Sequence, residues 1–264
     1  MQRCCRTPAI PCSSVIPSIQ FTQFREDFGR GTRLLHPQAS ITVGPAISGQ
    51  QLDFAMDPCA ISAGVFHQHA DLYRDKFMNL TLYDESYREF GALLRPGRAR
   101  VLDAACGPGN VSRCLMAQRL ELDLLGIDLA PRMVELAREA VPLAHFAVHD
   151  CRQLAELQLR FDGIICAFGL PYLSAEESKA FIRAASQALD PSGVLYLSTM
   201  LGRCEDSGFE RCSTGDQLYI NYHSEEQVVY WLQECGFRML KRSRLPSPSA
   251  ASKRTTDLIV IAQK

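Results

Sequence analysis

The chain has 264 residues, enough for one large domain or two small ones, and its 47% hydrophobic and 22% charged residues are typical of a globular protein. Its 28 Lys and Arg residues balance its 29 Asp and Glu residues, so the net charge of −1 offers no basic field, and no nucleic-acid partner is expected. No apolar run approaches the length of a membrane span, so no membrane partner is expected either.

The eleven cysteines are scattered along the chain and form no C-x-x-C pair. This spacing is typical neither of a metal site nor of a disulfide framework, so we predict no metal and reduced thiols in a reducing compartment. The expected location is therefore cytoplasmic. An organelle is the alternative if the N-terminal residues are a transit peptide.

Residues 1–56 differ in composition from the rest of the chain. They are rich in Pro, Ser, Gln and Gly, and three arginines precede the first acidic residue, Glu26. An acid-poor start is typical of a transit peptide, but no clear amphipathic helix accompanies it. We favour a disordered or dispensable extension. Sequence upstream of Met56 that is not natural coding sequence is a third interpretation, and the folded domain is expected over 57–264.

Two helices are predicted ahead of the first strand. A helical period of apolar residues covers 64–80. A second helix is predicted over 84–94, with Asp84 as its cap, and it ends before a Pro-Gly pair.

The next stretch, residues 101–110, reads V-L-D-A-A-C-G-P-G-N. It predicts a buried strand and a sharp glycine turn, with Asn110 capping a helix over 111–119. This order opens a nucleotide-binding βαβ unit, in which glycines let a ligand lie against the backbone. The third glycine of a dinucleotide fingerprint is replaced by Ser112. Asp103 would repel a pyrophosphate and would suit an ammonium group.

Strands and helices then alternate to residue 200, which predicts a parallel sheet with helices on both faces. The linker before the last strand is too short for a crossover helix, so the last two strands are expected to be antiparallel neighbours. The fold class is α/β, a doubly wound, mostly parallel seven-stranded sheet with a C-terminal antiparallel hairpin. Further strands are expected over 122–127, 145–148, 161–168, 193–200, 238–245 and 257–262, helices over 131–140, 175–189 and 225–235, a loop over 202–217 and a tyrosine-bearing segment over 218–223.

Acidic residues follow the second and third predicted strands, where open α/β sheets bind their ligands. Asp128 lies 21 positions after Gly107 and could accept hydrogen bonds from both ribose hydroxyls. It supports a nucleoside without choosing between NAD and S-adenosylmethionine. Asp150 follows the third strand, and Phe168 ends the fourth.

The 101–110 stretch, together with G-I-D-x-x-P-x-M at 126–133, resembles the class I S-adenosylmethionine-dependent methyltransferases of the small-molecule type. The strand order extends the resemblance to about residues 64–264. The resemblance implies a Rossmann-like fold, S-adenosyl-L-methionine as cofactor, a small-molecule acceptor and lid helices over 64–95. The residues that it implies for cofactor binding are Asp103, Ala104, Cys106, Gly107, Gly109, Asp128, Leu129, Met133, Asp150, Cys151, Phe168 and Tyr73.

Methyl transfer from a sulfonium requires mainly positioning, and a general base is needed only if the acceptor must lose a proton. No strong candidate for a base stands out. His223 precedes a predicted helix start and is interpreted as a surface residue, and His67 and His69 are not expected to bind metal. The weak catalytic candidates are Tyr172, Tyr219, Tyr222 and His223.

Two other functions stay open from the sequence. An NAD-dependent oxidoreductase would share the glycine turn and Asp128 but would leave Asp103 and the C-terminal hairpin unexplained. A non-catalytic S-adenosylmethionine-binding module would bind the cofactor without turnover. Base methylation is disfavoured, because residues 169–172 read G-L-P-Y and not the N/D-P-P-Y/F motif.

Overall fold

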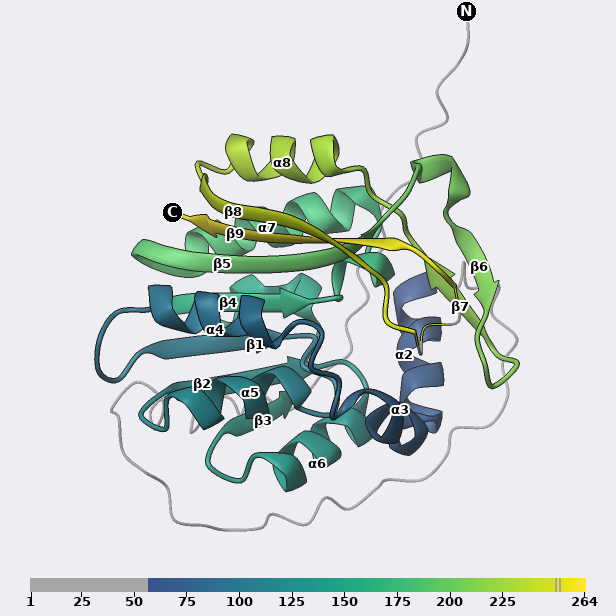
Figure 1. The fold of residues 1–264 in the computed structure, drawn as a ribbon, viewed down its shortest axis with the longest axis horizontal. Helices are drawn as coiled ribbons and strands as arrows, with labels where there is room; N and C mark the ends of the chain where they lie inside the picture. The colour runs from purple at the N-terminus through teal and green to yellow at the C-terminus, as the bar shows by residue number, and fades with distance from the viewer. Residues whose placement is uncertain (1–56, 250, 252) are drawn as a thin grey trace, which may run out of the picture. The chain divides into compact units, whose positions relative to one another are not determined.

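The computed structural model describes residues 57–249, 251 and 253–264 (Figure 1). The extension predicted over 1–56 lies outside the described residues. In the described part of the chain, no helix has the length and apolar character needed to span a membrane.

A seven-stranded sheet has the order β3-β2-β1-β4-β5-β9-β8. Strands β1 to β5 pair in parallel, and β9 is antiparallel to both β5 and β8, which confirms the predicted fold class. Residues Val101 to Ala104 of the central strand are fully buried, as expected for a strand covered on both faces. The strands are β1 Arg100–Ala104, β2 Asp123–Asp128, β3 His145–Val148, β4 Phe161–Ala167, β5 Leu189–Leu201, β8 Arg238–Pro246 and β9 Thr256–Gln263.

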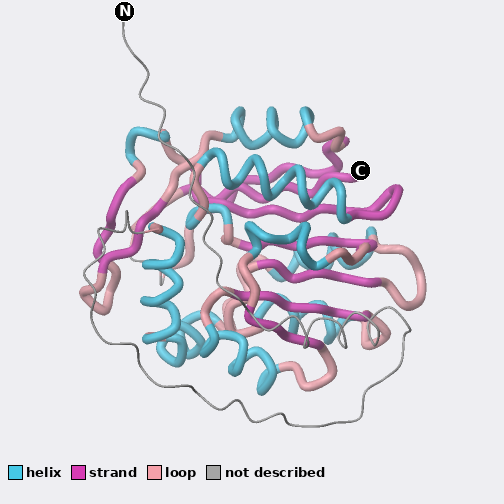
Figure 2. Tube along the Cα trace, turned by 180° about the vertical axis from the view of Figure 1, so that it is seen from behind, coloured by secondary structure: helices cyan, strands magenta, loops and turns pink. Residues whose placement is uncertain are grey.

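Helices cover both faces of this sheet (Figures 1 and 2). One face carries α4 Asp84–Leu93, α5 Asn110–Gln118 and α6 Pro131–Ala140, and the other carries α7 Ala175–Ala188 and α8 Glu225–Glu234. A short 3-10 helix, η1 Cys151–Leu157, follows β3. Pro131 at the first position of α6 and the capping box of Ser174 and Glu177 at the start of α7 explain why these helices begin where they do.

Two separate helices, α2 Pro58–Gln68 and α3 Ala70–Phe77, replace the single helix predicted over 64–80. Helix α2 begins six residues earlier because the Asp57 carboxylate caps it, accepting a hydrogen bond from Cys59 N at 3.0 Å. The helices separate at His69, whose backbone leaves the helical region. The predicted cap of α4 is also wrong, since Tyr83 is the N-cap residue and Asp84 is the first helical residue.

A small hairpin of β6 Gly208–Arg211 and β7 Gln217–Ile220 spans parts of the loop predicted over 202–217 and of the tyrosine-bearing segment predicted over 218–223. Its strands are only four residues long and half exposed, so they carry little apolar signal. The Phe209 and Tyr219 rings pack across the hairpin at 5.0 Å. Tyr219 N also donates a hydrogen bond to Ser62 Oγ at 3.3 Å, which holds β7 against α2.

Candidate cofactor and acceptor site

The turn between β1 and α5 is the centre of the site. Gly107 and Gly109 have φ values of +53° and +86°, in the left-handed region that favours glycine. A Cβ on Gly109 would lie 3.1 Å from Ala137 Cα, so this glycine also allows α6 to approach. Asn110 is the first residue of α5, and Gly109 is its N-cap residue, so the predicted Asn110 cap is wrong. Gly109 adopts the left-handed conformation immediately before the helix begins, so the helix starts one residue earlier than predicted.

Two cavities meet at this turn. The large cavity has a volume of about 520 Å³ and the small cavity about 90 Å³. The wall of the large cavity is contributed by α2, α3, the glycine turn, the β6–β7 hairpin and the segment before β9, and its lining is mainly apolar. The residues that line both cavities include Phe66, Tyr73, Ala105, Gly107, Phe168 and Tyr172.

Most of the predicted cofactor residues line these cavities. Cys106 is in the wall of the large cavity, while Asp103, Ala104 and Gly109 are buried and belong to neither wall. Their contacts with a cofactor stay a prediction. The predicted residues in the wall of the small cavity are Gly107, Asp128, Leu129, Met133, Asp150, Cys151, Phe168 and Tyr73.

Asp128 connects the end of β2 to the glycine turn. Its Oδ2 accepts a hydrogen bond from Gly107 N at 2.9 Å, and its Oδ1 accepts one from Ala130 N at 2.8 Å. Burial raises the pKa of this carboxyl, although the backbone donors oppose the shift. A carboxylate has about four acceptor positions, so two remain for the hydroxyls of a ribose in the small cavity.

Asp103 lies beneath the turn, fully buried at the end of β1. Its Oδ2 accepts a hydrogen bond from Ser112 Oγ at 2.6 Å, and its Oδ1 has no hydrogen-bond partner among the described residues. Burial raises the pKa of Asp103 to about 7. The unpartnered oxygen has the chemistry to accept a hydrogen bond from an ammonium group, the role that the resemblance implies.

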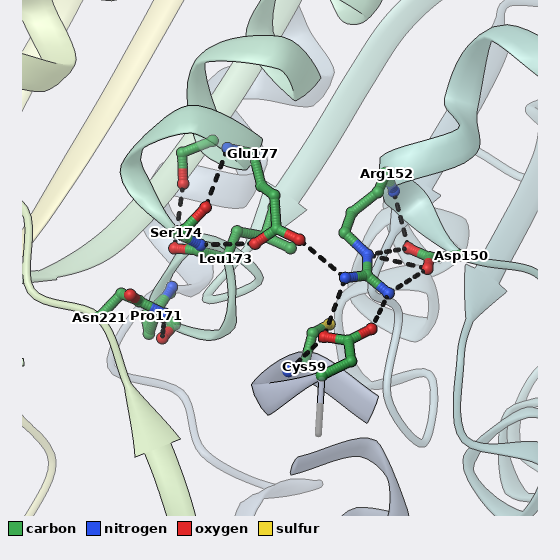
Figure 3. A network of polar contacts seen from close by, with 10 residues as sticks. Cys59, Asp150, Arg152, Pro171, Leu173, Ser174, Glu177 and Asn221 are labelled. Carbon is green, nitrogen blue, oxygen red and sulfur yellow. Dashed lines mark hydrogen bonds and ion pairs between the residues drawn. The ribbon is translucent and has the colours of Figure 1, made fainter. Parts of the chain in front are cut away.

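Asp150 belongs to an ionic network that sequence reasoning missed (Figure 3). Arg152 lies 2.7 Å from Asp150 Oδ2, 2.7 Å from Asp57 Oδ2 and 2.8 Å from Glu177 Oε1. Through these ion pairs, Arg152 connects the start of α2 to the start of η1 and to α7. Both Asp150 oxygens already accept hydrogen bonds from Arg152, so an adenine amino group would share them with it.

Aromatic rings surround the junction of the two cavities. The Phe66 ring lies 5.5 Å from Tyr73 and 5.0 Å from Tyr172, and Tyr73 lies 4.7 Å from Phe77. Burial, together with the nearby Asp128 charge, raises the pKa of Tyr73 to about 12. These rings form an apolar environment in which a sulfonium methyl would be shielded from water.

Of the weak catalytic candidates, Tyr172 and Tyr222 line the large cavity, whereas Tyr219 and His223 do not belong to either wall. Tyr222 donates a hydrogen bond to Glu210 Oε1 at 2.8 Å and accepts one from Lys253 Nζ at 2.9 Å. Burial raises the pKa of Tyr172 above its usual range.

The interpretation of His223 as a surface residue is wrong, because the side chain is only 1% exposed. Its Nε2 lies 3.3 Å from both Ser178 Oγ and Leu170 O, and its ring packs 5.4 Å from Trp231. Burial lowers its pKa. The backbone bridge between His223 and Leu201 turns the side chain into the core just before α8 begins.

The two histidines at the C-terminal end of α2 have protein partners. His69 Nε2 lies 2.8 Å from Asp216 Oδ2, and His67 Nδ1 accepts a hydrogen bond from Arg132 N at 3.1 Å. Among the described residues, no group of three or more His, Cys, Asp or Glu side chains could hold a metal ion.

Comparison with known proteins identifies one domain within this chain. The family model described as a methyltransferase domain matches residues 101–193, from the first strand through the glycine turn to β5. The chain carries a class I S-adenosylmethionine-dependent methyltransferase domain. This confirms the resemblance, and S-adenosylmethionine, the predicted cofactor, is the methyl donor of this class.

Curated relatives of the methyltransferase domain are named ubiquinone biosynthesis O-methyltransferases. The protein of Xanthomonas axonopodis pv. citri is 37% identical over 163 residues, 56% of this chain and 66% of that protein. The protein of Xanthomonas campestris pv. campestris strain B100 is 37% identical over 110 residues, 40% of this chain and 44% of that protein. The chain thus spans less than two thirds of the length of the curated relatives it matches.

Solved structures share the fold of the methyltransferase domain. The magnesium protoporphyrin IX methyltransferase of Synechocystis PCC 6803, solved with bound S-adenosylmethionine, superposes with a TM-score of 0.61 at 20% identity. The match covers 81% of this chain and 100% of that chain. This match supports the overall fold of the sheet and its helices.

Proposed function

We propose that this chain transfers the methyl group of S-adenosylmethionine to a small-molecule acceptor. The observation that carries the proposal is the junction of the two cavities at the glycine turn, with Gly107 and Phe168 in both walls. We infer that adenosine occupies the small cavity, the methionine part follows the turn above Asp103, and the acceptor enters the large cavity.

The proposed mechanism depends on positioning. S-adenosylmethionine, when bound, supplies a methyl group already activated by its sulfonium. Asp128 would hold the ribose, and Asp103 would hold the ammonium. Tyr73, Tyr172 and Phe168 would exclude water from the transfer path. Holding the nucleophile in line with the methyl–sulfur bond supplies much of the acceleration for such a displacement.

The acceptor is proposed to be a mainly apolar molecule with a hydroxyl as nucleophile. The rings of Phe66, Phe77, Tyr87 and Phe168 line the large cavity, so flat apolar groups would bury well there. The curated relatives are named O-methyltransferases, which favours oxygen as the methylated atom.

Product formation tests this proposal. The full chain is incubated with methyl-labelled S-adenosylmethionine and a panel of phenols with apolar substituents, and products are measured by mass spectrometry. We expect a labelled methyl ether with the wild type and a loss of product with Asp128→Ala. Binding of S-adenosylhomocysteine without product from any acceptor would favour the non-catalytic binding module instead.

A further inference from the structure

Asp257, near the start of β9, is a buried carboxylate in the wall of the large cavity. Its Oδ2 accepts a hydrogen bond from the Tyr83 hydroxyl at 2.5 Å, and its Oδ1 accepts one from Thr255 Oγ1 at 3.1 Å. Only 1% of the residue is exposed. The carboxylate is therefore fixed in orientation, and each oxygen keeps a further lone pair.

The position of Asp257 connects it to the transfer path. The ring of its partner Tyr83 packs 5.0 Å from Phe168, one of the residues that line both cavities. Asp257 pairs with Met200 across the β5–β9 ladder, and Met200 lines the large cavity as well. The residues of the glycine turn face the same cavity. The carboxylate therefore lies on the acceptor side of the proposed methyl position.

The charge environment of Asp257 favours proton uptake. Burial raises the pKa of Asp257, although the hydrogen bonds from the neutral hydroxyls of Tyr83 and Thr255 oppose the shift. Glu210, another carboxylate in the wall of this cavity, differs because it lies 2.7 Å from Lys253 Nζ. A carboxylate paired with a cation is a weaker base than one held by neutral donors.

We propose that Asp257 is the general base of this site and accepts the proton of the acceptor hydroxyl, with Tyr83 as its positioning residue. This inference rests on the proposed function. The acceptor oxygen donates an electron pair to the methyl carbon, and the carbon–sulfur bond breaks with its electron pair going to sulfur. The hydroxyl proton passes to an Asp257 oxygen. The products are a methyl ether, S-adenosylhomocysteine and a protonated Asp257, which returns its proton to solvent.

Binding of a chromophoric phenol, followed by its absorption, tests the proposal without knowledge of the natural acceptor. The probe is 4-nitrophenol, whose absorption reports whether its hydroxyl carries a proton, bound to the full chain in the presence of S-adenosylhomocysteine. A carboxylate beside the hydroxyl opposes a second negative charge, so it raises the apparent pKa of the bound phenol. The other ionisable groups that interact with Asp257 include Tyr83 of the α4 N-cap and Tyr196 of β5, and burial raises the pKa of both hydroxyls.

We expect the phenolate absorption of the bound probe to appear at higher pH than in free solution, and Asp257→Asn to remove this shift. Asp257→Asn keeps an acceptor oxygen but cannot take up a proton. With an acceptor found by the product assay, kcat should therefore fall about 100-fold or more while KM changes little. Tyr83→Phe should preserve the shift and lower kcat less. Asp206→Asn, which changes an exposed acid paired with Arg203, is the matched control and should match the wild type.

Binding of S-adenosylhomocysteine distinguishes a failure of the proposed function from a failure of the Asp257 assignment. If the wild type does not bind it, the proposed function fails. If every variant binds it, but the probe does not bind or shows the same pKa in wild type and Asp257→Asn, the assignment of Asp257 is overturned and the proposed function stands.

Discussion

Asp128 and Asp103 are two acidic residues next to the glycine turn, and their surroundings differ. Asp128 has a backbone donor on each oxygen and remains in the wall of the small cavity. Asp103 is fully buried, with one oxygen bound to Ser112 and the other without a hydrogen-bond partner among the described residues. The same residue type therefore occurs in two environments, and we propose that Asp128 accepts hydrogen bonds from the ribose and Asp103 from the ammonium group of the cofactor.

The first prediction concerns Asp128→Ala. The change removes the proposed ribose acceptor and the acceptor for Gly107 N, so S-adenosylhomocysteine should bind more weakly by about 1.5–3 kcal/mol, the scale of a charged hydrogen bond. Isothermal titration calorimetry measures this difference. Glu121→Ala, which changes an exposed acid paired with Arg119, is the control. Unchanged affinity in a folded Asp128→Ala protein would remove Asp128 from the site.

The second prediction concerns the pH dependence of stability at Asp103. Its pKa is about 7 in the folded protein against an ordinary value of 3.8, so the unfolded chain loses this proton first as pH rises. The free energy of unfolding should therefore fall as pH rises between these two values, by up to about 4 kcal/mol. Asp103→Asn should lack this component. Urea unfolding of both proteins across the window tests it, and parallel pH dependences would contradict it.

At the scale of elements, the Arg152 network joins the start of α2 to the core. Helix α2 contributes Cys59, Ser62 and Phe66 to the small cavity, so its attachment should affect cofactor affinity. Asp57→Asn keeps the helix cap but removes the charge that pairs with Arg152.

This third prediction is a roughly fivefold loss of S-adenosylhomocysteine affinity, about 1 kcal/mol, in Asp57→Asn. Amide hydrogen exchange in α2 should also be faster in the free protein. Asp206→Asn breaks an exposed ion pair far from α2 in sequence and should change neither quantity. Equal exchange rates in α2 for Asp57→Asn and wild type would show that the network does not hold the helix.

A fourth prediction separates the two glycines of the turn. Both have positive φ, so replacing either by alanine costs about 1–3 kcal/mol of backbone strain. A Cβ at Gly109 would also meet Ala137 at 3.1 Å, while none of the described atoms lies within 4 Å of a Cβ at Gly107. Gly109→Ala should therefore lower the free energy of unfolding further than Gly107→Ala, by at least about 1 kcal/mol. Equal urea midpoints would contradict the close approach of α5 and α6.

The elements that the sequence predicted best are those with strong local signals. The bounds of α6 and β3 agree with prediction because a proline begins the helix and a short apolar run forms the strand. The β6–β7 hairpin was missed because four-residue, half-exposed strands carry little periodicity. Arg152 and Asp257 were missed because their roles depend on contacts between residues distant in sequence. An acidic residue directly before the apolar run of β9 was the available signal for Asp257.

At the scale of the whole molecule, the sheet order brings the ends of β1, β2, β3 and β4 to one edge, where both cavities open. The family match covers the glycine turn and the ends of β2, β3 and β4, which carry most of the residues predicted to bind the cofactor. Helices α2 and α3, the β6–β7 hairpin and the segment before β9 lie outside that match and line the large cavity proposed for the acceptor. Motifs in the sequence therefore predicted the cofactor, whereas the segments that line the proposed acceptor cavity carry no motif that predicts the acceptor.

The most direct test of the central claim is a calorimetric titration of the full chain with S-adenosylhomocysteine, with NADH as the comparison ligand. We expect S-adenosylhomocysteine to bind and NADH not to bind, because a carboxylate at Asp103 beneath the glycine turn would repel a pyrophosphate. Binding of NADH in place of S-adenosylhomocysteine, or binding of neither ligand, would contradict the proposed cofactor site.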